Sequence, residues 1–269
     1  MRRRREPIGS ADAAPAAADH AATVDSLQRG LEALRCFQSG EDALPTVEIA
    51  RRLGLTRATT RRLLMTLAAQ GFLQCGSDGD TFGLHVASFV VGQAMLSGSP
   101  LVRAARSQLQ ALTARFPVHA LLCVGDRGEL LVLVHQAGAA APPWLLGAGA
   151  RLPVGDTALG HAWLWMQSSV CQGEFLARLR EKTTISVGLA PVWKAFHDLE
   201  ISGTCSSVWS GRGGVELTAA PVLLHDGTMA VLACVKVGMQ VVPDAACALA
   251  LRQTADAIRE DVRGNVRRR

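Results

Sequence analysis

The chain has 269 residues, which is enough for one large domain or two small ones. Hydrophobic residues make up 49% of it and charged residues 19%, which predicts a globular protein with a substantial core. The net charge of +5 is too small to identify a partner by itself. The sequence has no apolar run of roughly 18 residues and no leucine-rich signal-peptide core, so we expect neither a membrane span nor secretion.

Seven cysteines are scattered along the chain without a CxxC pair. An odd number with this spacing argues against a disulfide framework and against a zinc site, so we expect no metal and no cofactor. Several of them lie in apolar runs, where a thiol behaves as a small hydrophobe. A reducing cytoplasm is the expected compartment.

Arginines cluster near both ends, at positions 2–5 and 267–269. Residues 1–22 are rich in Ala, Pro, Asp and Gly, which predicts disorder, and we expect residues 264–269 to form a basic tail. Two interpretations of these ends remain open. They either attract phosphates without sequence specificity or are simply solvated.

The next part of the chain predicts three short helices. A first helix over 25–38 has Asp25 or Ser26 available as its N-cap, and its expected buried stripe is Leu27, Leu31, Leu34 and Phe37. Thr46 is the predicted N-cap of a second helix that ends at Gly54. Its buried candidates are Val47, Ile49, Ala50 and Leu53. A third helix is expected from about Arg57 to Gln70.

A two-stranded ribbon is predicted after Gly71. Residues 72–75 and 81–84 are strand candidates around the turn-rich tip GSDGD. The order helix, helix, glycine turn, helix, ribbon is that of a winged helix-turn-helix, which we assign to residues 23–85. Residues 86–99 predict a linker helix that is apolar on more than one face, and such a helix often packs against another chain.

Residues 100–263 mix helices with hairpins, which predicts an α+β domain with an antiparallel sheet. Helices are expected over 101–116, 157–166, 173–181, 191–199 and 243–263. Strands are expected over 118–125, 129–136, 215–224 and 228–238. Asp126-Arg127-Gly128 and His225-Asp226-Gly227 are the predicted hairpin turns.

The third helix has two distinct faces. Helical periodicity directs one set of residues to the core, namely Thr60, Leu63, Leu64 and Leu67. Arginine forks on the opposite face can bind phosphates or guanine, and small or hydroxyl-bearing residues allow close approach to a duplex. The predicted DNA contacts are Arg57, Ala58, Thr59, Arg61 and Arg62, together with Thr46 on the preceding helix.

A basic helical face is more often solvated than bound to DNA, but the turn and ribbon around this one favour DNA binding. No acidic residue occurs between Leu55 and Gly76. The wing tip carries Asp78 and Asp80, so we expect the wing to approach phosphates through backbone groups or not at all.

Three segments resemble the N-terminal domain of the IclR family of bacterial transcriptional regulators: SLQRGLEALRCF, VEIARRLGLTRATTRRLLMTLAAQGFL and TFGLHVASFVVGQAMLS. GARLPVGDTALGHAWL (149–164) and AAPVLLHDGTMAVLACVKVG resemble parts of that family's effector-binding domain. The resemblance covers about residues 23–262 and is loose near 170–200. Thr60 departs from it, because an aliphatic residue is usual there. Its methyl can still pack and its hydroxyl can bond back to the preceding turn, so we expect a slightly weaker helix anchor and no loss of fold.

The resemblance implies a winged-helix repressor or activator with a ligand-sensing domain, assembled as a homodimer or homotetramer. Such a protein binds a pseudo-palindromic operator in double-stranded DNA, because each recognition helix reads one half-site. A small-molecule effector, of the organic or aromatic acid class, would modulate this binding.

The helix over 157–166 starts with free backbone N–H groups that suit an anionic ligand. Asp156 is a good N-cap that would compete for them, which leaves three alternatives: a neutral ligand, a carboxylate bound elsewhere, or an Asp156 that points away. Trp209 either walls an aromatic or acyl ligand or fills the core. The predicted effector-site residues are Leu122, Leu152, Asp156, Thr157, Ala158, Cys205, Trp209, Ala220 and Cys234.

Two other functions are less well supported. A hydrolase using Cys205 and His225 would lack a nucleophile elbow, and His225-Asp226-Gly227 is better explained as a hairpin turn. A ligand-independent DNA-binding protein is disfavoured by the large second domain with its own core. We therefore expect a regulator and not an enzyme.

Overall fold

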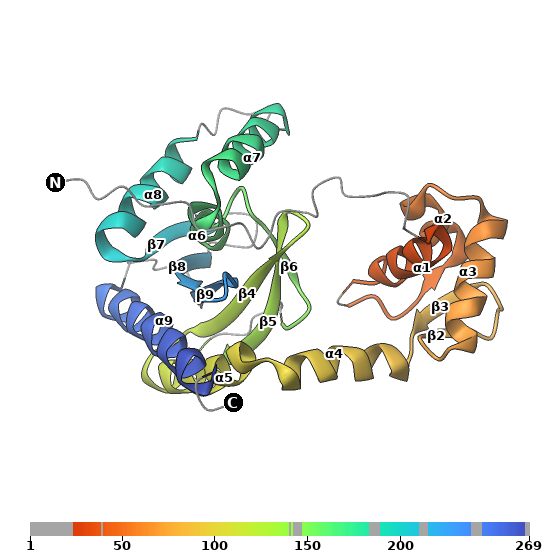
Figure 1. Ribbon diagram of the computed structural model, residues 1–269, viewed down its shortest axis with the longest axis horizontal. Coiled ribbons are helices and arrows are strands. Elements are labelled where there is room, and N and C mark those ends of the chain that lie inside the picture. The colour runs from red at the N-terminus through yellow and green to blue at the C-terminus, as the bar shows by residue number, and fades with distance from the viewer. Residues whose placement is uncertain are drawn as a thin grey trace. The chain divides into compact units, whose positions relative to one another are not determined.

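The computed structural model describes residues 24–38, 40–139, 141, 147–182, 189–209, 215–237 and 244–266. The chain divides between Ser99 and Pro100 into two compact units, which are described separately (Figure 1). We call residues 24–99 the N-terminal unit and residues 100–266 the C-terminal unit. The predictions for residues 1–22 and 267–269 lie outside the described residues.

The N-terminal unit is a winged helix-turn-helix, as predicted. Its helices are α1 (Asp25–Arg35), α2 (Thr46–Leu53), α3 (Arg57–Ala69) and α4 (Val86–Gly98). Its strands are β1 (Leu44–Pro45), β2 (Leu73–Cys75) and β3 (Thr81–Leu84). They form an antiparallel sheet in the order β1-β3-β2, so the ribbon β2–β3 gains a short third strand from the segment before α2.

A small apolar core joins α1, α2, α3 and the ribbon. It includes Ala33, Ile49, Leu64 and Phe82, all fully buried. Thr60 is also fully buried, which confirms that it faces the core. Its hydroxyl, however, has no hydrogen-bond partner among the described residues, so the predicted bond to the preceding turn is wrong. A buried hydroxyl without a partner costs about 1–3 kcal/mol.

Several predicted buried residues are exposed. Leu27 is 62% and Leu31 53% exposed, because α1 turns Gly30 and Ala33 toward the core. Val47 on α2 is 59% exposed. The spacing correctly indicated amphipathic helices, but periodicity does not say whether the chain itself covers the apolar stripe.

The predicted N-caps of the first two helices are also wrong. Val24 and Pro45 occupy these positions, and neither helix has a side-chain cap hydrogen bond. Thr46 is instead the first residue of α2. Pro45 suits the start of a helix because it has no N–H group to leave unsatisfied.

The C-terminal unit is built on a six-stranded antiparallel sheet in the order β6-β5-β4-β9-β8-β7. The strands are β4 (His119–Asp126), β5 (Glu129–Ala137), β6 (Arg151–Pro153), β7 (Cys205–Trp209), β8 (Val215–Leu223) and β9 (Met229–Val237). Both predicted hairpin turns are present, with Gly128 and Gly227 at positive φ. The edge strands β6 and β7 were not predicted.

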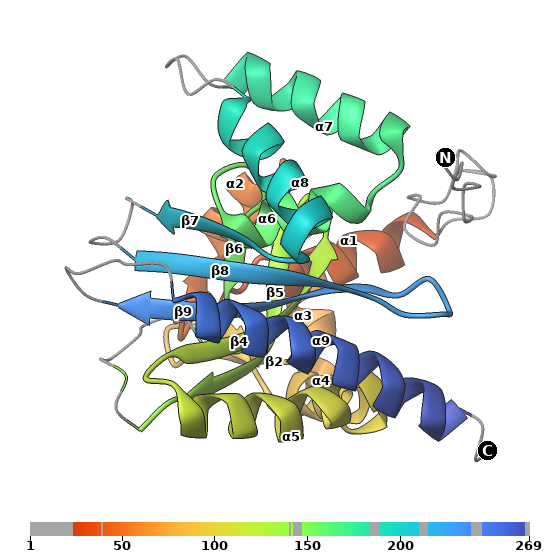
Figure 2. The same ribbon diagram turned by 90° about the vertical axis from the view of Figure 1, so that its left-hand side faces the viewer.

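Helices cover both faces of this sheet. They are α5 (Pro100–Arg115), α6 (Ala158–Met166), α7 (Ser169–Lys182), α8 (Ala190–Ser202) and α9 (Ala245–Val266). Figure 2 shows α5 and α9 side by side on one face and α6, α7 and α8 on the other. The last helix continues to Val266, so residues 264–266 belong to α9 and not to a tail. No helix in the described part of the chain is long and apolar enough to span a membrane.

Candidate DNA-binding face and effector site

A tight turn fixes how α3 follows α2. Gly54 ends α2 with a positive φ of 65°, and the Leu55 N–H donates to the Ala50 carbonyl at 3.1 Å. Glycine is suited to this left-handed position because it has no Cβ. The Thr56 hydroxyl then caps α3 by accepting a hydrogen bond from the Thr59 N–H at 3.2 Å. Thr56 was not among the predicted N-caps.

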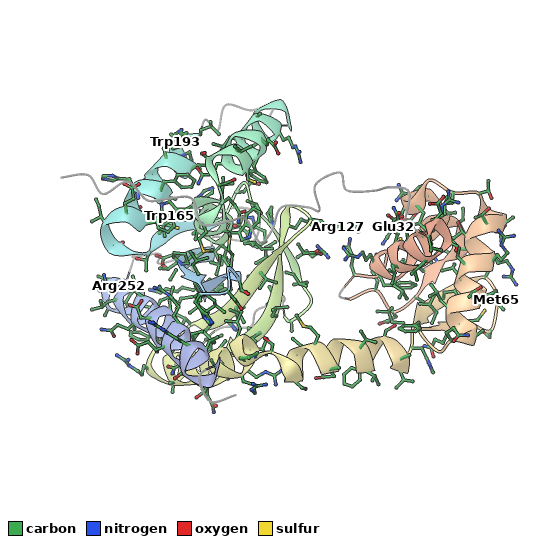
Figure 3. The ribbon with its side chains drawn as sticks, viewed as in Figure 1. Glu32, Met65, Arg127, Trp165, Trp193 and Arg252 are labelled. Atoms are coloured by element: carbon green, nitrogen blue, oxygen red, sulfur yellow. The ribbon has the colours of Figure 1, made fainter. Side chains whose placement is uncertain are left out.

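The outer face of α3 is basic. Arg57, Ala58, Arg61 and Arg62 are exposed, and Thr59 is half-buried at the edge. Met65 lies on the same face and points outward (Figure 3). Each residue lies on the face of α3 that its spacing predicted. Their contacts with DNA remain a prediction.

The three arginines of this face have different surroundings. The Arg57 Nη2 atom forms an ion pair with the Asp80 carboxylate at 2.9 Å. The Arg61 guanidinium donates to the Gly79 carbonyl. Arg62 has no side-chain partner among the described residues. Two guanidinium groups are thus held by the wing tip, and the third extends into solvent.

The acidic residues of the wing tip have structural partners. The Asp78 carboxylate accepts hydrogen bonds from the Asp80 and Thr81 N–H groups and from the Thr81 hydroxyl, which lowers the pKa of Asp78. The hydrogen bond from Arg57 is the main cause of the lowered pKa of Asp80. These carboxylates therefore stabilise the turn and orient an arginine. Their acidity alone did not predict these roles.

Thr46 does not lie on the exposed face, which corrects its place among the predicted DNA contacts. It is fully buried, and both its N–H and its hydroxyl donate to the Asp80 carbonyl at 2.8 Å. Thr46 therefore holds the wing against the start of α2 and offers no hydroxyl to DNA.

The basic residues of α2 are engaged in a structural cluster. Arg52 donates to Glu41, Glu48 and the Cys36 carbonyl, which ties α2 to the segment after α1. Hydrogen bonds from Arg51 and Arg52 lower the pKa of Glu48 to about 2. The charges of α2 are thereby compensated, in contrast to that of Arg62 on α3.

Four of the predicted effector-site residues come together at the start of α6. Leu152, Thr157, Ala158 and Cys205 are all buried there. Thr157, not Asp156, is the N-cap: its hydroxyl accepts from the Gly160 N–H at 3.1 Å and donates to the Pro153 carbonyl at 2.9 Å. Asp156 is exposed and does not cap the helix, which agrees with the alternative in which it points away.

Ser207, which was not predicted as a site residue, occupies the N-terminal end of α6. Its hydroxyl accepts a hydrogen bond from the Ala158 N–H at 2.8 Å, and the Cys205 thiol donates to the Ala158 carbonyl at 3.4 Å. The N–H groups of Ala158 and Gly160 are therefore not free, contrary to the prediction. Ser207 lies 49 residues beyond Ala158, so local spacing could not reveal this contact.

Three other predicted effector-site residues lie on the opposite face of the sheet. They are Leu122, Ala220 and Cys234. Each is the strand neighbour of a core residue that faces α6, as Leu122 is of Leu121 and Ala220 is of Ala219. Successive residues of a strand point to opposite faces. These three residues therefore face α5 and α9 and are not neighbours of Thr157. Trp209 does lie on the α6 side, where it packs half-buried against the core.

The structure also disfavours the hydrolase alternative. Burial raises the pKa of the Cys205 thiol to about 12, so it is protonated at neutral pH. Cys205 pairs with Ala219 in the sheet, whereas His225 lies beyond Leu223 in the β8–β9 turn. The four residue-to-residue steps from Ala219 to Leu223 span about 13 Å. No group of three or more histidine, cysteine or acidic residues in the described part of the chain could hold a metal ion.

The winged helix-turn-helix defines a class of DNA-binding proteins, and in this chain a separate α+β unit follows it. Residues 26–75 match the family model of the IclR helix-turn-helix domain. The Pca regulon regulatory protein of Pseudomonas putida is 27% identical over 81% of this chain and 75% of its own length. The p-hydroxybenzoate hydroxylase transcriptional activator of Acinetobacter baylyi is 27% identical over 88% of this chain and 91% of its own length.

Solved structures show the same fold. An IclR family transcriptional regulator from Brucella abortus superposes with a TM-score of 0.79, covering 92% of this chain and 96% of that one at 24% identity. An IclR homolog from Microbacterium hydrocarbonoxydans, complexed with 4-hydroxybenzoate, superposes with a TM-score of 0.71 at 22% identity. The match covers 89% of this chain and 99% of that one. Residues 26–75 thus match the helix-turn-helix domain of the IclR family, and the chain is similar over most of its length to transcriptional regulators.

Proposed function

We propose that this regulator reads a pseudo-palindromic operator through the exposed face of α3, with Arg57, Arg61 and Arg62 as its cationic contacts. One observation carries this proposal. Hydrogen bonds to the wing tip hold the Arg57 and Arg61 side chains, and Arg62 beside them has no acidic partner among the described residues. Guanidinium groups that are already ordered lose less rotamer freedom on binding. Each phosphate contact also releases condensed counterions, so binding should weaken steeply with salt.

The proposed effector is a small aromatic or other organic acid that binds on the α6 side of the sheet. Support comes from the relative that is complexed with 4-hydroxybenzoate and from the buried N-terminus of α6. The Ser207 hydroxyl already accepts from the Ala158 N–H at that helix end. A carboxylate oxygen would displace this hydroxyl, and the exposed Asp156 would not block it.

A second copy of the chain is the proposed cover for the apolar faces of the N-terminal unit. The helix α4 is described in full and has no buried residue within its unit. Phe89, Val90 and Met95 of α4 are exposed, as are Leu27 and Leu31 of α1. Large exposed apolar residues gathered on one helix, as on α4, are typical of an association surface. We expect the homodimer, or a tetramer built from it, to act in the cytoplasm.

Operator binding should respond in opposite directions to two substitutions. Arg62→Ala should weaken binding on the order of tenfold and reduce the salt slope by about 1, because one phosphate or base contact is lost. Asp80→Asn should strengthen binding, because it removes a negative charge from the wing tip while the asparagine oxygen still accepts the hydrogen bond that orders Arg57. Fluorescence anisotropy with a duplex from the region beside its own gene measures both. Arg178→Ala in α7 is the control and should match the wild type. Wild-type affinity in Arg62→Ala would contradict the proposal.

Ligand binding should depend on Ser207. Thermal shift and calorimetry with 4-hydroxybenzoate should show binding, and Ser207→Ala should tighten it severalfold by removing the competing hydroxyl. Ser206→Ala is the matched control, because the Ser206 hydroxyl bonds to Thr218 on the other face of the sheet. Equal effects of the two variants would place the ligand away from α6. No binding of this ligand by the wild type would contradict the proposed acid class.

Assembly should depend on α4. Sedimentation equilibrium of the full chain should show a dimer or tetramer, and Phe89→Glu should shift it toward a smaller species because a charge would be buried in the interface. Val170→Glu in α7 introduces the same charge at an exposed apolar residue and should leave assembly unchanged. A monomeric wild type would rule out the proposed interface.

A further inference from the structure

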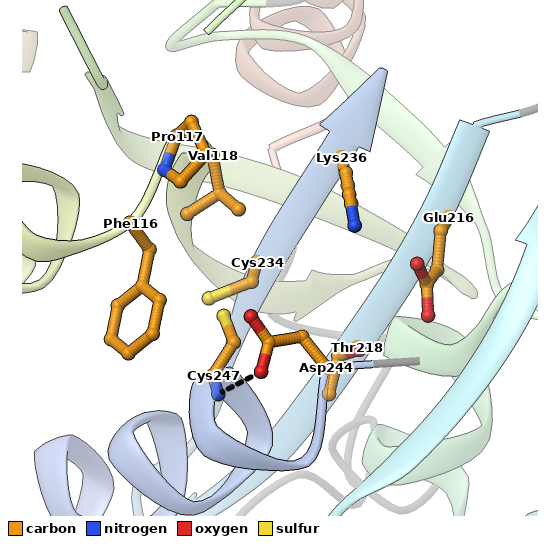
Figure 4. A pocket seen from close by; sticks show the side chains of 9 residues that line it. All are labelled: Phe116, Pro117, Val118, Glu216, Thr218, Cys234, Lys236, Asp244 and Cys247. Carbon is orange, nitrogen blue, oxygen red and sulfur yellow. Dashed lines mark hydrogen bonds between the residues drawn. The ribbon is translucent and has the colours of Figure 1, made fainter. Parts of the chain in front are cut away.

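Two cysteines face each other on the side of the sheet that α5 and α9 cover. Cys234 lies on β9 and Cys247 in the first turn of α9, and their sulfur atoms point toward one another (Figure 4). They line a cavity of about 40 Å³ whose polar wall includes Glu216, Lys236 and Asp244. This cavity lies on the opposite face of the sheet from α6, so it is separate from the proposed effector site.

The start of α9 holds Cys247 in place. The Asp244 carboxylate accepts hydrogen bonds from the Ala246 N–H at 3.0 Å and from the Cys247 N–H at 3.1 Å. Cys234 is fixed by the ladder of the central strand β9, where it pairs with Ala120 and Thr218. Both partners therefore sit on ordered backbone, and each side chain is directed by a different element.

The two thiols are chemically unequal. A hydrogen bond from the Cys234 thiol lowers the pKa of Cys247, and the same interaction raises the pKa of Cys234. Lys236 also lowers the pKa of Cys247, while burial, Asp244 and Glu216 act in the opposite direction. Because the thiolate is the reactive form, Cys247 is the better nucleophile of the pair.

The cavity limits what can reach the sulfur atoms. One water molecule needs about 10–15 Å³ of such space, so 40 Å³ admits a few water-sized molecules but not an aromatic acid. Cys234 is only 4% and Cys247 6% exposed, so larger reagents are excluded as well. Hydrogen peroxide is small enough to enter.

We propose that Cys234 and Cys247 form a redox site that hydrogen peroxide converts into an intramolecular disulfide. The Cys247 thiolate attacks a peroxide oxygen, the O–O bond breaks, and hydroxide departs as the leaving group. The product is a sulfenic acid on Cys247. The Cys234 sulfur then attacks this sulfenic sulfur, an S–S bond forms, and the hydroxyl group leaves with the Cys234 proton as water. In total, two thiols and one peroxide give one disulfide and two waters.

The oxidised form would link β9 covalently to the first turn of α9. Dithiothreitol should reverse it once denaturation exposes the disulfide, because thiol–disulfide exchange restores both thiols. The other cysteines provide internal comparisons, since Cys75 is exposed and Cys171 is half-buried. If exposure alone controlled reactivity, Cys75 would be oxidised first.

The test treats the full chain with near-stoichiometric hydrogen peroxide, then denatures it, alkylates the remaining thiols and maps peptides by mass spectrometry. We expect a Cys234–Cys247 disulfide that disappears after dithiothreitol, with Cys75 still alkylated. This measurement on the wild type does not depend on how any variant folds.

Two variants test the assigned roles. Cys234→Ser should trap a sulfenic acid at Cys247 that dimedone labels once the treated chain is denatured, whereas Cys247→Ser should show neither disulfide nor label at Cys234. Cys75→Ser is the control and should give the wild-type disulfide. Oxidation confined to Cys75 and Cys171, or full alkylation of Cys234 and Cys247 after peroxide, would overturn the proposal.

Discussion

Two adjacent residues of the wing tip, Gly79 and Asp80, connect every element of the DNA-binding face. The Asp80 carbonyl accepts from Thr46 at the start of α2, and its carboxylate pairs with Arg57 on α3. The Gly79 carbonyl accepts from Arg61 one turn further along. The wing therefore fixes the direction of two guanidinium groups before DNA arrives. Arg62 then supplies a charge that nothing in the described unit compensates.

The arginines of α2 and α3 differ in whether acidic side chains neutralise them. Arg51 and Arg52 on α2 are as basic as the residues of α3, but Glu48 and Glu41 pair with them. A count of arginines would rank both helices equally. The ion pairs show that, of these two helices, only α3 has an arginine without an acidic partner among the described residues. This agrees with the similarity to proteins that regulate transcription.

The C-terminal unit divides its chemistry between the two faces of one sheet. On the α6 side, buried apolar residues surround a helix end whose Ala158 N–H is met by Ser207. On the other side, Cys234 and Cys247 lie beside a small polar cavity. Residues only one position apart on a strand, such as Ala219 and Ala220, therefore face opposite sides of the sheet.

The sequence was most informative where local rules decide the structure. Helical spacing placed Thr60 and Leu64 in the core, and turn residues located both hairpins of the C-terminal unit. Spacing failed for Leu27 and Leu31, because an apolar stripe does not indicate which surface covers it. Spacing also failed for the sheet. Because helices cover both of its faces, its strands are largely apolar, and the sequence does not indicate which residues face α6.

Long-range contacts account for the remaining differences. The bond from Ala158 to Ser207 and the bonds from Thr46 to Asp80 join residues that are far apart in the chain. Local patterns contain no information about such pairs. Ser207, Gly79 and the carbonyl of Asp80 could therefore be recognised as important only in the folded structure.

The most direct test of the central claim is a photocrosslink from the exposed face of α3 to operator DNA. A benzophenone amino acid at Met65, a large exposed residue of that face, should crosslink to the bound duplex. The same group at Trp193 of α8, also large and exposed, should not. Crosslinking from Trp193 but not from Met65, in protein that still binds the duplex, would contradict the assignment of α3 as the reading helix.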